Sequence, residues 1–327
     1  VSLYDVKPWA EDEASPMTVY PNYQLIVPPQ VVKEITEGKK PQTFENAKDI
    51  KIVEGSWGTI DGPAEEASPY AKGHIDGSPH INTDSIEPPP AWMLADDETL
   101  IKVANDYGFT PEDTVVVTGK DTLAMYRVAY ALRYMGIADV RVLNGGLDAW
   151  ERLGYPLVTE TTEPTPGTAY TSGDQFNKDL VTTQDELHAL LGTDGYVLVD
   201  NRTWEEHIGN DSGYSYHDKK GRIPEAIYGY AGRPGEGSSS VTFFQNIDKT
   251  MRRAEEITEL WTSQGIDLNT ERIDTMCGSG WRVAEIATYF NVLGYDNVKM
   301  YSDGWIGWST KPDNPTETGV PELQPKY

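Results

Sequence analysis

The sequence predicts an α/β protein of two tandem domains, each built on a parallel β-sheet with helices on both faces. A chain of 327 residues exceeds one ordinary domain core and commonly forms two domains of about 150 residues. The chain also repeats itself. GIADVRVLNGGLDAW at 136–150 matches GYDNVKMYSDGWIGW at 294–308 position for position, at an offset of 158. A tandem duplication explains this match far better than chance.

Three further pairs of segments extend the repeat toward the start of each copy. One pair keeps the offset of 158 and two lie at offsets of 148 and 146, so the second copy carries about ten extra residues in between. The pairs are TPEDTVVVTG (110–119) with LNTERIDTMC (268–277), KGHIDGSPHI (72–81) with KGRIPEAIYG (220–229), and IVEGSW (52–57) with LVDNRTW (198–204).

Each copy alternates short apolar runs with amphipathic stretches of ten to fifteen residues. The expected strands lie at 115–117 and 140–143 in the first copy and at 272–276 and 298–301 in the second. The expected helices run from Ala124 to Met135 and from Arg282 to Leu293. Short strands alternating with helices predict a parallel sheet covered on both faces.

Composition sets the expected boundaries. The segment between the two copies is rich in Thr, Pro and Gly, which is typical of a linker. We expect an N-terminal arm at 1–21, a first domain at 22–158, a linker at 159–180, a second domain at 181–310 and a C-terminal tail at 311–327.

The charge balance limits the partners. The chain carries 52 acidic and 27 basic residues, a net charge of −25, which argues against nucleic acid and anionic membranes as partners. No apolar run approaches the ~20 residues of a membrane span. The chain opens at Val1 without a visible signal peptide, which fits a processed periplasmic or otherwise exported protein and equally a trimmed chain; a cytoplasmic location is the alternative.

Cysteine and histidine usage argues against a metal centre. Cys277 is the only cysteine, so neither an intrachain disulfide nor a multi-cysteine metal site can form. No two histidines have the i, i+4 spacing of a helical zinc site, and we expect neither a metal nor a cofactor. The histidines are His74, His80, His188, His207 and His217.

Cys277 lies at the mouth of a glycine-rich loop, in DTMCGSGWRVAE (274–285). Gly278 and Gly280 let the backbone turn inward, so that the free amides at the start of the next helix point at one spot. With Arg282 nearby, such a nest favours a thiolate, a bound anion, or both. The alternative is a small buried residue, the usual fate of a lone cysteine. The matching position of the first copy is Gly119, so packing does not require sulfur there.

Cys-Gly-Ser-Gly-Trp-Arg at 277–282 resembles the active-site loop of the rhodanese family of sulfurtransferases, and the likeness extends over about residues 45–310. It implies two tandem rhodanese-like domains, of which the first is inactive and the second catalytic, as in multidomain bacterial thiosulfate sulfurtransferases. Gly119 and Ala124 stand in the first copy where Cys277 and Arg282 stand in the second. Four residues separate Cys277 from Arg282, whereas related phosphatases have five, so the likeness favours sulfur transfer.

The resemblance implies covalent catalysis by Cys277. Its thiolate would attack the outer sulfur of thiosulfate, release sulfite and keep a persulfide, which cyanide, another thiol or an acceptor protein would then discharge. The amides of residues 278–282 would stabilise the terminal sulfur. Ser279 would offer a hydroxyl to the sulfur or stabilise the loop, and Trp281 would line the pocket or pack. Asp274 is expected to point away from the thiolate or to pair with a base.

Two arginines are candidates for an anion contact. Arg282 would bind the sulfite end of the donor, hold the loop through carbonyls, or both. Arg202 matches a strand-end arginine near the family's active site; its alternative role is a surface salt bridge with Asp200 or Glu205. The family's second arginine is replaced by Glu206, which weakens the case for efficient use of thiosulfate or 3-mercaptopyruvate. Arg233, in a glycine-rich loop, is a candidate to compensate.

Three other functions remain open at this point. Cys277 could act as a persulfide carrier that accepts sulfur only from a dedicated donor protein. The Cys-Gly-Ser-Gly start also resembles 3-mercaptopyruvate sulfurtransferases, although the arginine ending does not. A phosphatase is disfavoured by loop length.

Overall fold

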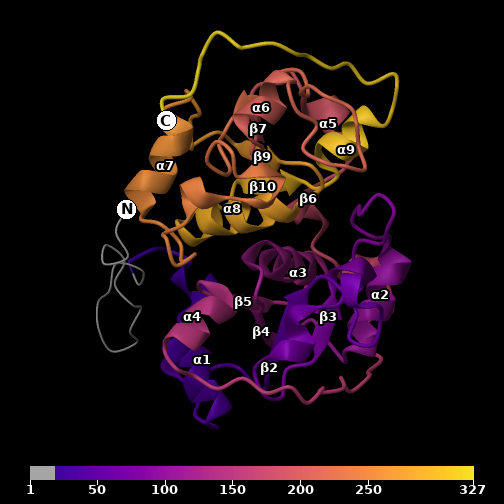
Figure 1. The fold of residues 1–327 in the computed structure, drawn as a ribbon, viewed down its shortest axis with the longest axis vertical. Coiled ribbons are helices and arrows are strands. Elements are labelled where there is room, and N and C mark those ends of the chain that lie inside the picture. The colour runs from indigo at the N-terminus through magenta and orange to yellow at the C-terminus, as the bar shows by residue number, and fades with distance from the viewer. Residues whose placement is uncertain (1–18) are drawn as a thin grey trace. The chain divides into compact units, whose positions relative to one another are not determined.

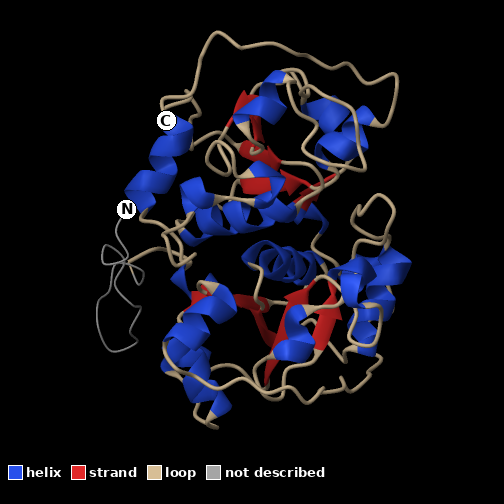
Figure 2. Ribbon diagram, in the orientation of Figure 1, coloured by secondary structure: helices blue, strands red, loops and turns tan. Residues whose placement is uncertain are grey.

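The computed structural model describes residues 19–327, in which the chain forms two α/β units. The first takes the described chain up to Lys178 together with Asp248–Thr250, and the second takes Asp179–Ile247 and Met251–Tyr327. In each unit, helices flank a central group of strands (Figure 1, Figure 2). Of the arm expected at 1–21, residues 1–18 lie outside the described residues.

The first unit contains a five-stranded parallel sheet in the order β1-β5-β4-β2-β3. The central strand β4 is buried along its whole length, so its TVVVT sequence is nearly continuous in apolar residues, as expected of a strand covered on both faces. The strands are β1 (Ile26–Val27), β2 (Ile50–Ser56), β3 (His80–Asn82), β4 (Thr114–Thr118) and β5 (Asp139–Leu143). The helices are α1 (Pro29–Thr36), α2 (Asp97–Asp106), α3 (Thr122–Tyr134) and α4 (Gly146–Arg152).

The second unit repeats this topology, with a parallel sheet in the order β6-β10-β9-β7-β8. The strands are β6 (Val181–Thr182), β7 (Tyr196–Asp200), β8 (Ile227–Tyr228), β9 (Arg272–Met276) and β10 (Val298–Tyr301). The helices are α5 (Gln184–Leu190), α6 (Trp204–Ile208), α7 (Ala254–Thr262), α8 (Trp281–Val292) and α9 (Gly304–Ser309). The predicted α/β fold of two parallel-sheet domains is confirmed.

The duplication extends to single hydrogen bonds. In the first unit the Leu147 amide donates to the Gly119 carbonyl over 2.8 Å, and in the second the Trp305 amide donates to the Cys277 carbonyl over 2.8 Å. Both pairs are related by the offset of 158 seen in the sequence. The position of the thiol is therefore a backbone position that the duplicated fold defines, occupied by glycine in one copy and cysteine in the other.

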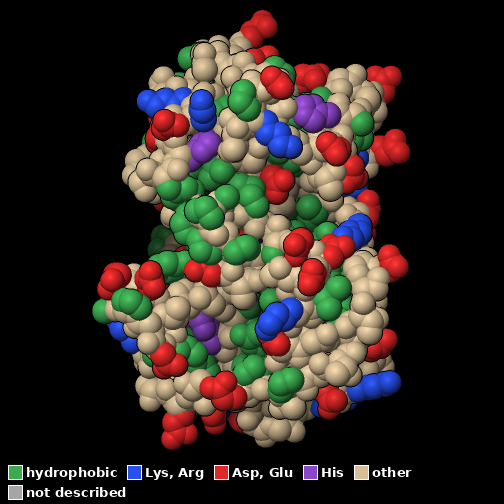
Figure 3. Space-filling model, turned by 90° about the vertical axis from the view of Figure 1, so that its right-hand side faces the viewer, with side chains coloured by type: hydrophobic (Ala, Val, Ile, Leu, Met, Phe, Trp, Pro, Cys, Tyr) green, Lys and Arg blue, Asp and Glu red, His purple; other side chains and the backbone are tan. Residues whose placement is uncertain are grey.

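The segment expected as a linker packs against the first unit over much of its length. Tyr170 is buried, and its hydroxyl donates to the Met135 carbonyl over 2.7 Å. The tail pairs with the second unit, where the amides and carbonyls of Glu317 and Arg222 bond reciprocally. No helix within residues 19–327 has both the length and the apolar character needed to cross a membrane. Acidic side chains are scattered over the face drawn in Figure 3.

A buried polar cluster lies beside β2 in the first unit. Ser56 Oγ contacts Glu54 Oε2 at 2.9 Å, Ser68 Oγ at 2.7 Å and His80 Nε2 at 2.8 Å. Glu54 is fully buried, and its Oε1 has no hydrogen-bond partner within the described chain. Burial raises the pKa of Glu54 to about 7, and burial lowers the pKa of His80 to about 4. Near neutral pH, Glu54 is therefore a group whose ionisation opposes folding.

We expect Glu54→Gln to become progressively more stable than the wild type as the pH rises from 4.5 to 7. Across that window the folded state retains a proton on Glu54 that the unfolded chain has lost, because the usual pKa is 4.5 and the folded value is about 7. The unfolding free energy of Glu54→Gln should gain roughly 3 kcal/mol on that of the wild type between pH 4.5 and 7, and the difference should stay constant above pH 7. The lowered pKa of His80 makes stability rise with pH in both proteins, which is the opposite of the effect of Glu54. The difference in unfolding free energy between the two proteins therefore reports on Glu54.

Urea unfolding between pH 4 and 8 measures this effect, with the exposed Glu65→Gln as the matched control. A difference in unfolding free energy between Glu54→Gln and the wild type that did not change with pH would contradict the assignment of a raised pKa.

Candidate functional site

The loop that carries the thiol connects the end of β9 at Met276 to the start of α8 at Trp281. Gly280 precedes the helix in the left-handed region, with φ at +109°, a conformation that a residue with a side chain rarely adopts. This turn brings the Gly280 amide back toward the start of the loop. The sequence Cys-Gly-Ser-Gly therefore folds into a tight strand-to-helix turn that opens at the N-terminus of α8.

The Cys277 sulfur accepts a hydrogen bond from the Gly280 amide over 3.3 Å. The sequence predicted that amides of the loop face the sulfur, and this contact has the predicted direction. Cys277 follows β9 directly, at the start of the loop as predicted, but its side chain is only 1% exposed, as the alternative of a small buried residue expects. Arg282 and Tyr214 both lie within electrostatic reach of this thiol, so its surroundings are polar although they are buried.

Helix α9 fixes the loop from behind. The amides of Trp305 and Ile306 donate to the carbonyls of Cys277 and Gly278 over 2.8 and 3.0 Å. Gly304 has φ at +59°, and a Cβ atom at this position would lie 2.4 Å from the Cys277 carbonyl oxygen. The Asp-Gly-Trp turn at residues 303–305 thus holds the loop that carries Cys277 at close range.

Tyr214 packs on the other side of the loop. A Cβ atom at Gly278 would lie 1.7 Å from the Tyr214 hydroxyl, so only glycine fits beneath the phenol in this arrangement. Arg282 Nη2 donates to this hydroxyl over 2.8 Å. Burial raises the pKa of Tyr214, so the phenol stays neutral. Sequence reasoning missed this residue, because the loop that carries it has no counterpart in the repeat pattern.

Arg282 forms a buried, bidentate ion pair with Glu206. Arg282 Nη1 and Nη2 lie 2.7 and 3.1 Å from the two carboxylate oxygens, and both side chains are at most 1% exposed. Burial alone would lower the pKa of Arg282, but the Glu206 carboxylate raises it well above its usual value. The sequence marked Glu206 as a departure from the family pattern and did not identify it as the partner of Arg282.

Arg202 forms a second buried, bidentate ion pair, with Asp200. Its Nε and Nη2 donate to the two carboxylate oxygens over 2.9 Å each, and Nη2 also donates to the Gly221 carbonyl over 2.7 Å. Burial would raise the pKa of Asp200, but Arg202 holds it below its usual value. The alternative of a salt bridge with Asp200 is therefore what the structure shows, although the pair is buried rather than on the surface. Arg202 Nη1 is buried without a hydrogen-bond partner among residues 19–327.

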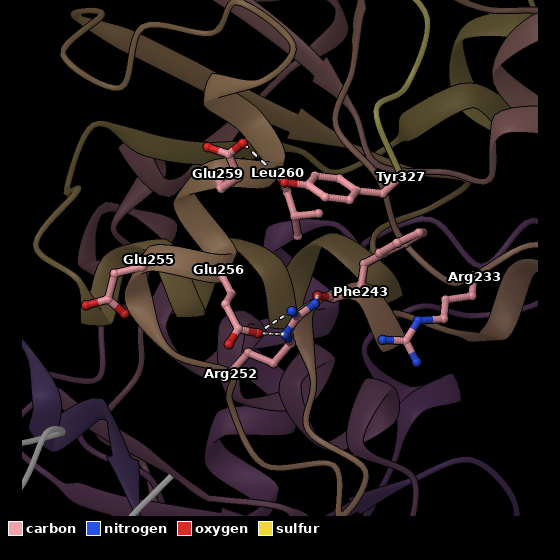
Figure 4. Close-up of a pocket in the computed structure, with 8 residues that line it drawn as sticks. All are labelled: Arg233, Phe243, Arg252, Glu255, Glu256, Glu259, Leu260 and Tyr327. Carbon is pink, nitrogen blue, oxygen red and sulfur yellow. Dashed lines mark hydrogen bonds and ion pairs between the residues drawn. The ribbon is translucent and has the colours of Figure 1, made fainter. Parts of the chain in front are cut away.

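Arg233 lines a pocket to which the loop that carries Cys277 does not contribute. It is exposed, with its guanidinium 5.8 Å from the Phe243 ring centre, and it lines a pocket that contains neither Cys277 nor Arg282. Figure 4 shows this pocket, in which Arg252 pairs with Glu256. That Arg233 compensates for the missing second arginine stays a prediction.

The remaining predicted residues lie in or beside the loop. Ser279 is 7% exposed and Trp281 is half-buried at the first position of α8. Asp274 is fully buried and pairs with Arg272, whose Nε lies 3.2 Å from its Oδ1, while the Tyr196 hydroxyl donates to Oδ2 over 2.7 Å. The expectation that Asp274 pairs with a base is confirmed.

The arrangement suits chemistry at a single sulfur atom. A helix N-terminus and backbone amides favour one negative charge at the start of α8. Arg282, which lies within electrostatic reach of the sulfur, and Arg202, which lies within electrostatic reach of Arg282, are each matched by a buried carboxylate. The site can therefore carry an anionic sulfur on the loop, and it contains neither a general base paired with the thiol nor a cluster of three candidate metal ligands within the described residues.

Comparisons with known proteins agree with this geometry. A family model of the rhodanese-like domain matches residues 44–153 and 183–311. The thiosulfate sulfurtransferase YnjE of Escherichia coli (strain K12) is 34% identical over 315 residues, which cover 95% of this chain and 69% of that protein. The mitochondrial thiosulfate/3-mercaptopyruvate sulfurtransferase 1 of Arabidopsis thaliana is 25% identical over 294 residues, which cover 83% of this chain and 74% of that protein.

Solved structures show the same likeness. The crystal structure of YnjE superposes with a TM-score of 0.83 at 33% identity, covering 92% of this chain and 70% of that chain. A structure of a tyrosine variant of EanB superposes with a TM-score of 0.84 at 29% identity, covering 92% of this chain and 72% of that chain. It holds a cysteine persulfide in a tetrahedral intermediate state with ergothioneine. Because the family model matches both halves of the chain and these relatives span most of its length, the chain belongs to the rhodanese family of sulfurtransferases and contains two rhodanese-like domains in tandem.

Proposed function

We propose that the protein moves a sulfane sulfur, a sulfur atom bonded only to sulfur, from thiosulfate or a related donor to a thiophilic acceptor through a persulfide on Cys277. The observation that carries this proposal is the Gly280 amide 3.3 Å from the Cys277 sulfur, in a loop that ends at the N-terminus of α8. Amide donors fixed at the place where a terminal sulfur anion forms lower the energy of that anion without reorganisation.

The reaction proceeds in two half-reactions. The Cys277 thiolate attacks the outer sulfur of thiosulfate, the S–S bond of the donor breaks, and sulfite leaves with the bonding electron pair. The enzyme then carries a persulfide with one negative charge. In the second half-reaction cyanide or a thiol attacks the terminal sulfur, the persulfide S–S bond breaks, and the Cys277 thiolate is restored. With cyanide the product is thiocyanate.

The relatives support this donor class. YnjE is named a thiosulfate sulfurtransferase, and the Arabidopsis relative is named for both thiosulfate and 3-mercaptopyruvate. The EanB structure holds a cysteine persulfide, which is the intermediate proposed here. 3-Mercaptopyruvate is the alternative donor, and turnover measured with each of the two donors decides between them.

Initial-rate kinetics with varied thiosulfate and cyanide test the proposal. Two half-reactions that share one covalent intermediate predict parallel double-reciprocal lines, and thiosulfate alone should release one sulfite per enzyme molecule in a rapid burst. Intersecting lines without a burst would contradict the persulfide. A persulfide carrier would instead give no burst with thiosulfate and would acquire sulfur only from a donor protein.

A further inference from the structure

The charges around the catalytic loop cancel before any substrate enters. Arg282 lies 2.7 and 3.1 Å from the Glu206 carboxylate oxygens, and all four side chains of the two arginine–carboxylate pairs are at most 1% exposed. Asp200, the partner of Arg202, also accepts a hydrogen bond from His207 Nδ1 over 2.8 Å. The remaining attraction for a negative charge is that of the loop amides and the start of α8.

This attraction is sufficient for one charge. The N-terminus of a helix acts as roughly half a positive charge. A second negative charge in the same buried site would need a cation, and both arginines already have a carboxylate at hydrogen-bond distance. Arg202 Nη1 can still donate a hydrogen bond, but the charge of Arg202 is balanced by Asp200. The net charge of −25 on the whole chain adds a further penalty for a dianion.

We infer that Glu206 determines the charge of the preferred sulfur donor. By binding Arg282 it withholds that cation from the substrate, so the site favours sulfane donors with a single negative charge over the thiosulfate dianion. This inference rests on the proposed function, because it concerns the donor of the same half-reaction. The donor class that fits comprises thiosulfonate and persulfide monoanions.

The local structure keeps Glu206 in this role. It is the third residue of α6, where it closes a capping box with Thr203: the Glu206 amide donates to Thr203 Oγ1 over 3.1 Å, and the Thr203 amide donates to Glu206 Oε1 over 3.3 Å. Glutamine also serves at this position of a capping box. Glu206→Gln therefore removes the charge while preserving the start of the helix.

The test compares two donors that differ in charge at the end remote from the reacting sulfur. Thiosulfate is a dianion, and methanethiosulfonate is a monoanion in which a methyl group replaces one oxygen. Both give their outer sulfur to Cys277 as their S–S bond breaks, releasing sulfite and methanesulfinate respectively. The quantity measured is the ratio of kcat/KM for thiosulfate to kcat/KM for methanethiosulfonate. Because both values come from the same protein, a general loss of activity in a variant cancels in the ratio.

We expect Glu206→Gln to raise this ratio about tenfold or more, because Arg282 becomes free to make a charge-assisted contact with the sulfite end. The matched control is Glu205→Gln, which changes the net charge equally on the exposed face of the same helix and should leave the ratio unchanged. The double variant Glu206→Gln/Arg282→Met should return the ratio to the wild-type value. If an unpaired Arg282 prevents folding, Glu206→Gln/Arg282→Lys takes the place of the single variant, because it keeps a cation without a carboxylate partner and should raise the ratio in the same direction.

A binding measurement separates this inference from the proposed function. Sulfate is an unreactive dianion that stabilises proteins in general, so at equal ionic strength relative to chloride it should raise the unfolding temperature of Glu206→Gln more than that of the wild type or of Glu205→Gln. If both donors load Cys277 and the ratio is the same in Glu206→Gln and Glu205→Gln, the inference is overturned while the persulfide stands. If neither donor loads Cys277 and sulfate still stabilises Glu206→Gln more than the wild type and Glu205→Gln, the persulfide fails and the role of Glu206 in setting the charge stands.

Discussion

Replacing Cys277 by serine is expected to abolish sulfur transfer, with a fall in turnover of at least about a thousandfold, because a serine hydroxyl stays protonated where the thiolate is the nucleophile. The substitution exchanges one heavy atom in a buried position, so the loop should keep its conformation. Thiocyanate formation from thiosulfate and cyanide measures the effect, and an unchanged unfolding temperature shows that the fold is intact. Undiminished turnover in this variant would refute the role of Cys277.

The second large effect is expected for Arg202→Met. This change removes the cation from a fully buried pair and leaves the Asp200 carboxylate without it, which costs about 3–5 kcal/mol of unfolding free energy. Because Arg202 holds the pKa of Asp200 below its usual value, the contribution of the pair is present above the ordinary pKa of an aspartate and is lost as the pH falls. The penalty should therefore shrink in acid, where protonation neutralises the isolated carboxyl.

Urea unfolding at several pH values measures this penalty. The double variant Asp200→Asn/Arg202→Met should recover most of the loss, and the exposed Arg233→Met serves as the control with little effect. A stability close to that of the wild type, combined with a raised KM for the donor, would mean that Arg202 binds substrate rather than stabilising the fold.

Sequence periodicity was sufficient to predict the centre of each unit. The strand expected at 272–276 is β9 (Arg272–Met276), and the helix expected from Arg282 to Leu293 is α8 (Trp281–Val292). Helix α8 carries a long apolar pattern, whereas β9 has the sequence RIDTM and was located by its match to the duplicated segment at 110–119. The outer strands β1, β6 and β8 span two residues each, which is too short for any periodic signal.

The composition of the loop was predictable, but its charge environment was not. Glycine spacing and the strand-to-helix position predicted amides that face the sulfur, and these are local properties of the chain. The partner of Arg282 depends on where the fold places α6 relative to the N-terminus of α8, and 76 positions separate Arg282 from Glu206 in the sequence. Tyr214 lies in an irregular segment without repeat or periodicity. A motif can therefore indicate the reacting atom while leaving its electrostatic surroundings open.

The most direct test of the central claim is the mass of the peptide that contains Cys277 after the protein has been incubated with a sulfane donor alone. Thiosulfate and methanethiosulfonate should each be tried, without cyanide or any partner protein. We expect a peptide heavier by the mass of one sulfur atom, and we expect this added mass to disappear after cyanide is added. A peptide of unchanged mass with both donors, in a protein that still produces thiocyanate, would contradict this claim.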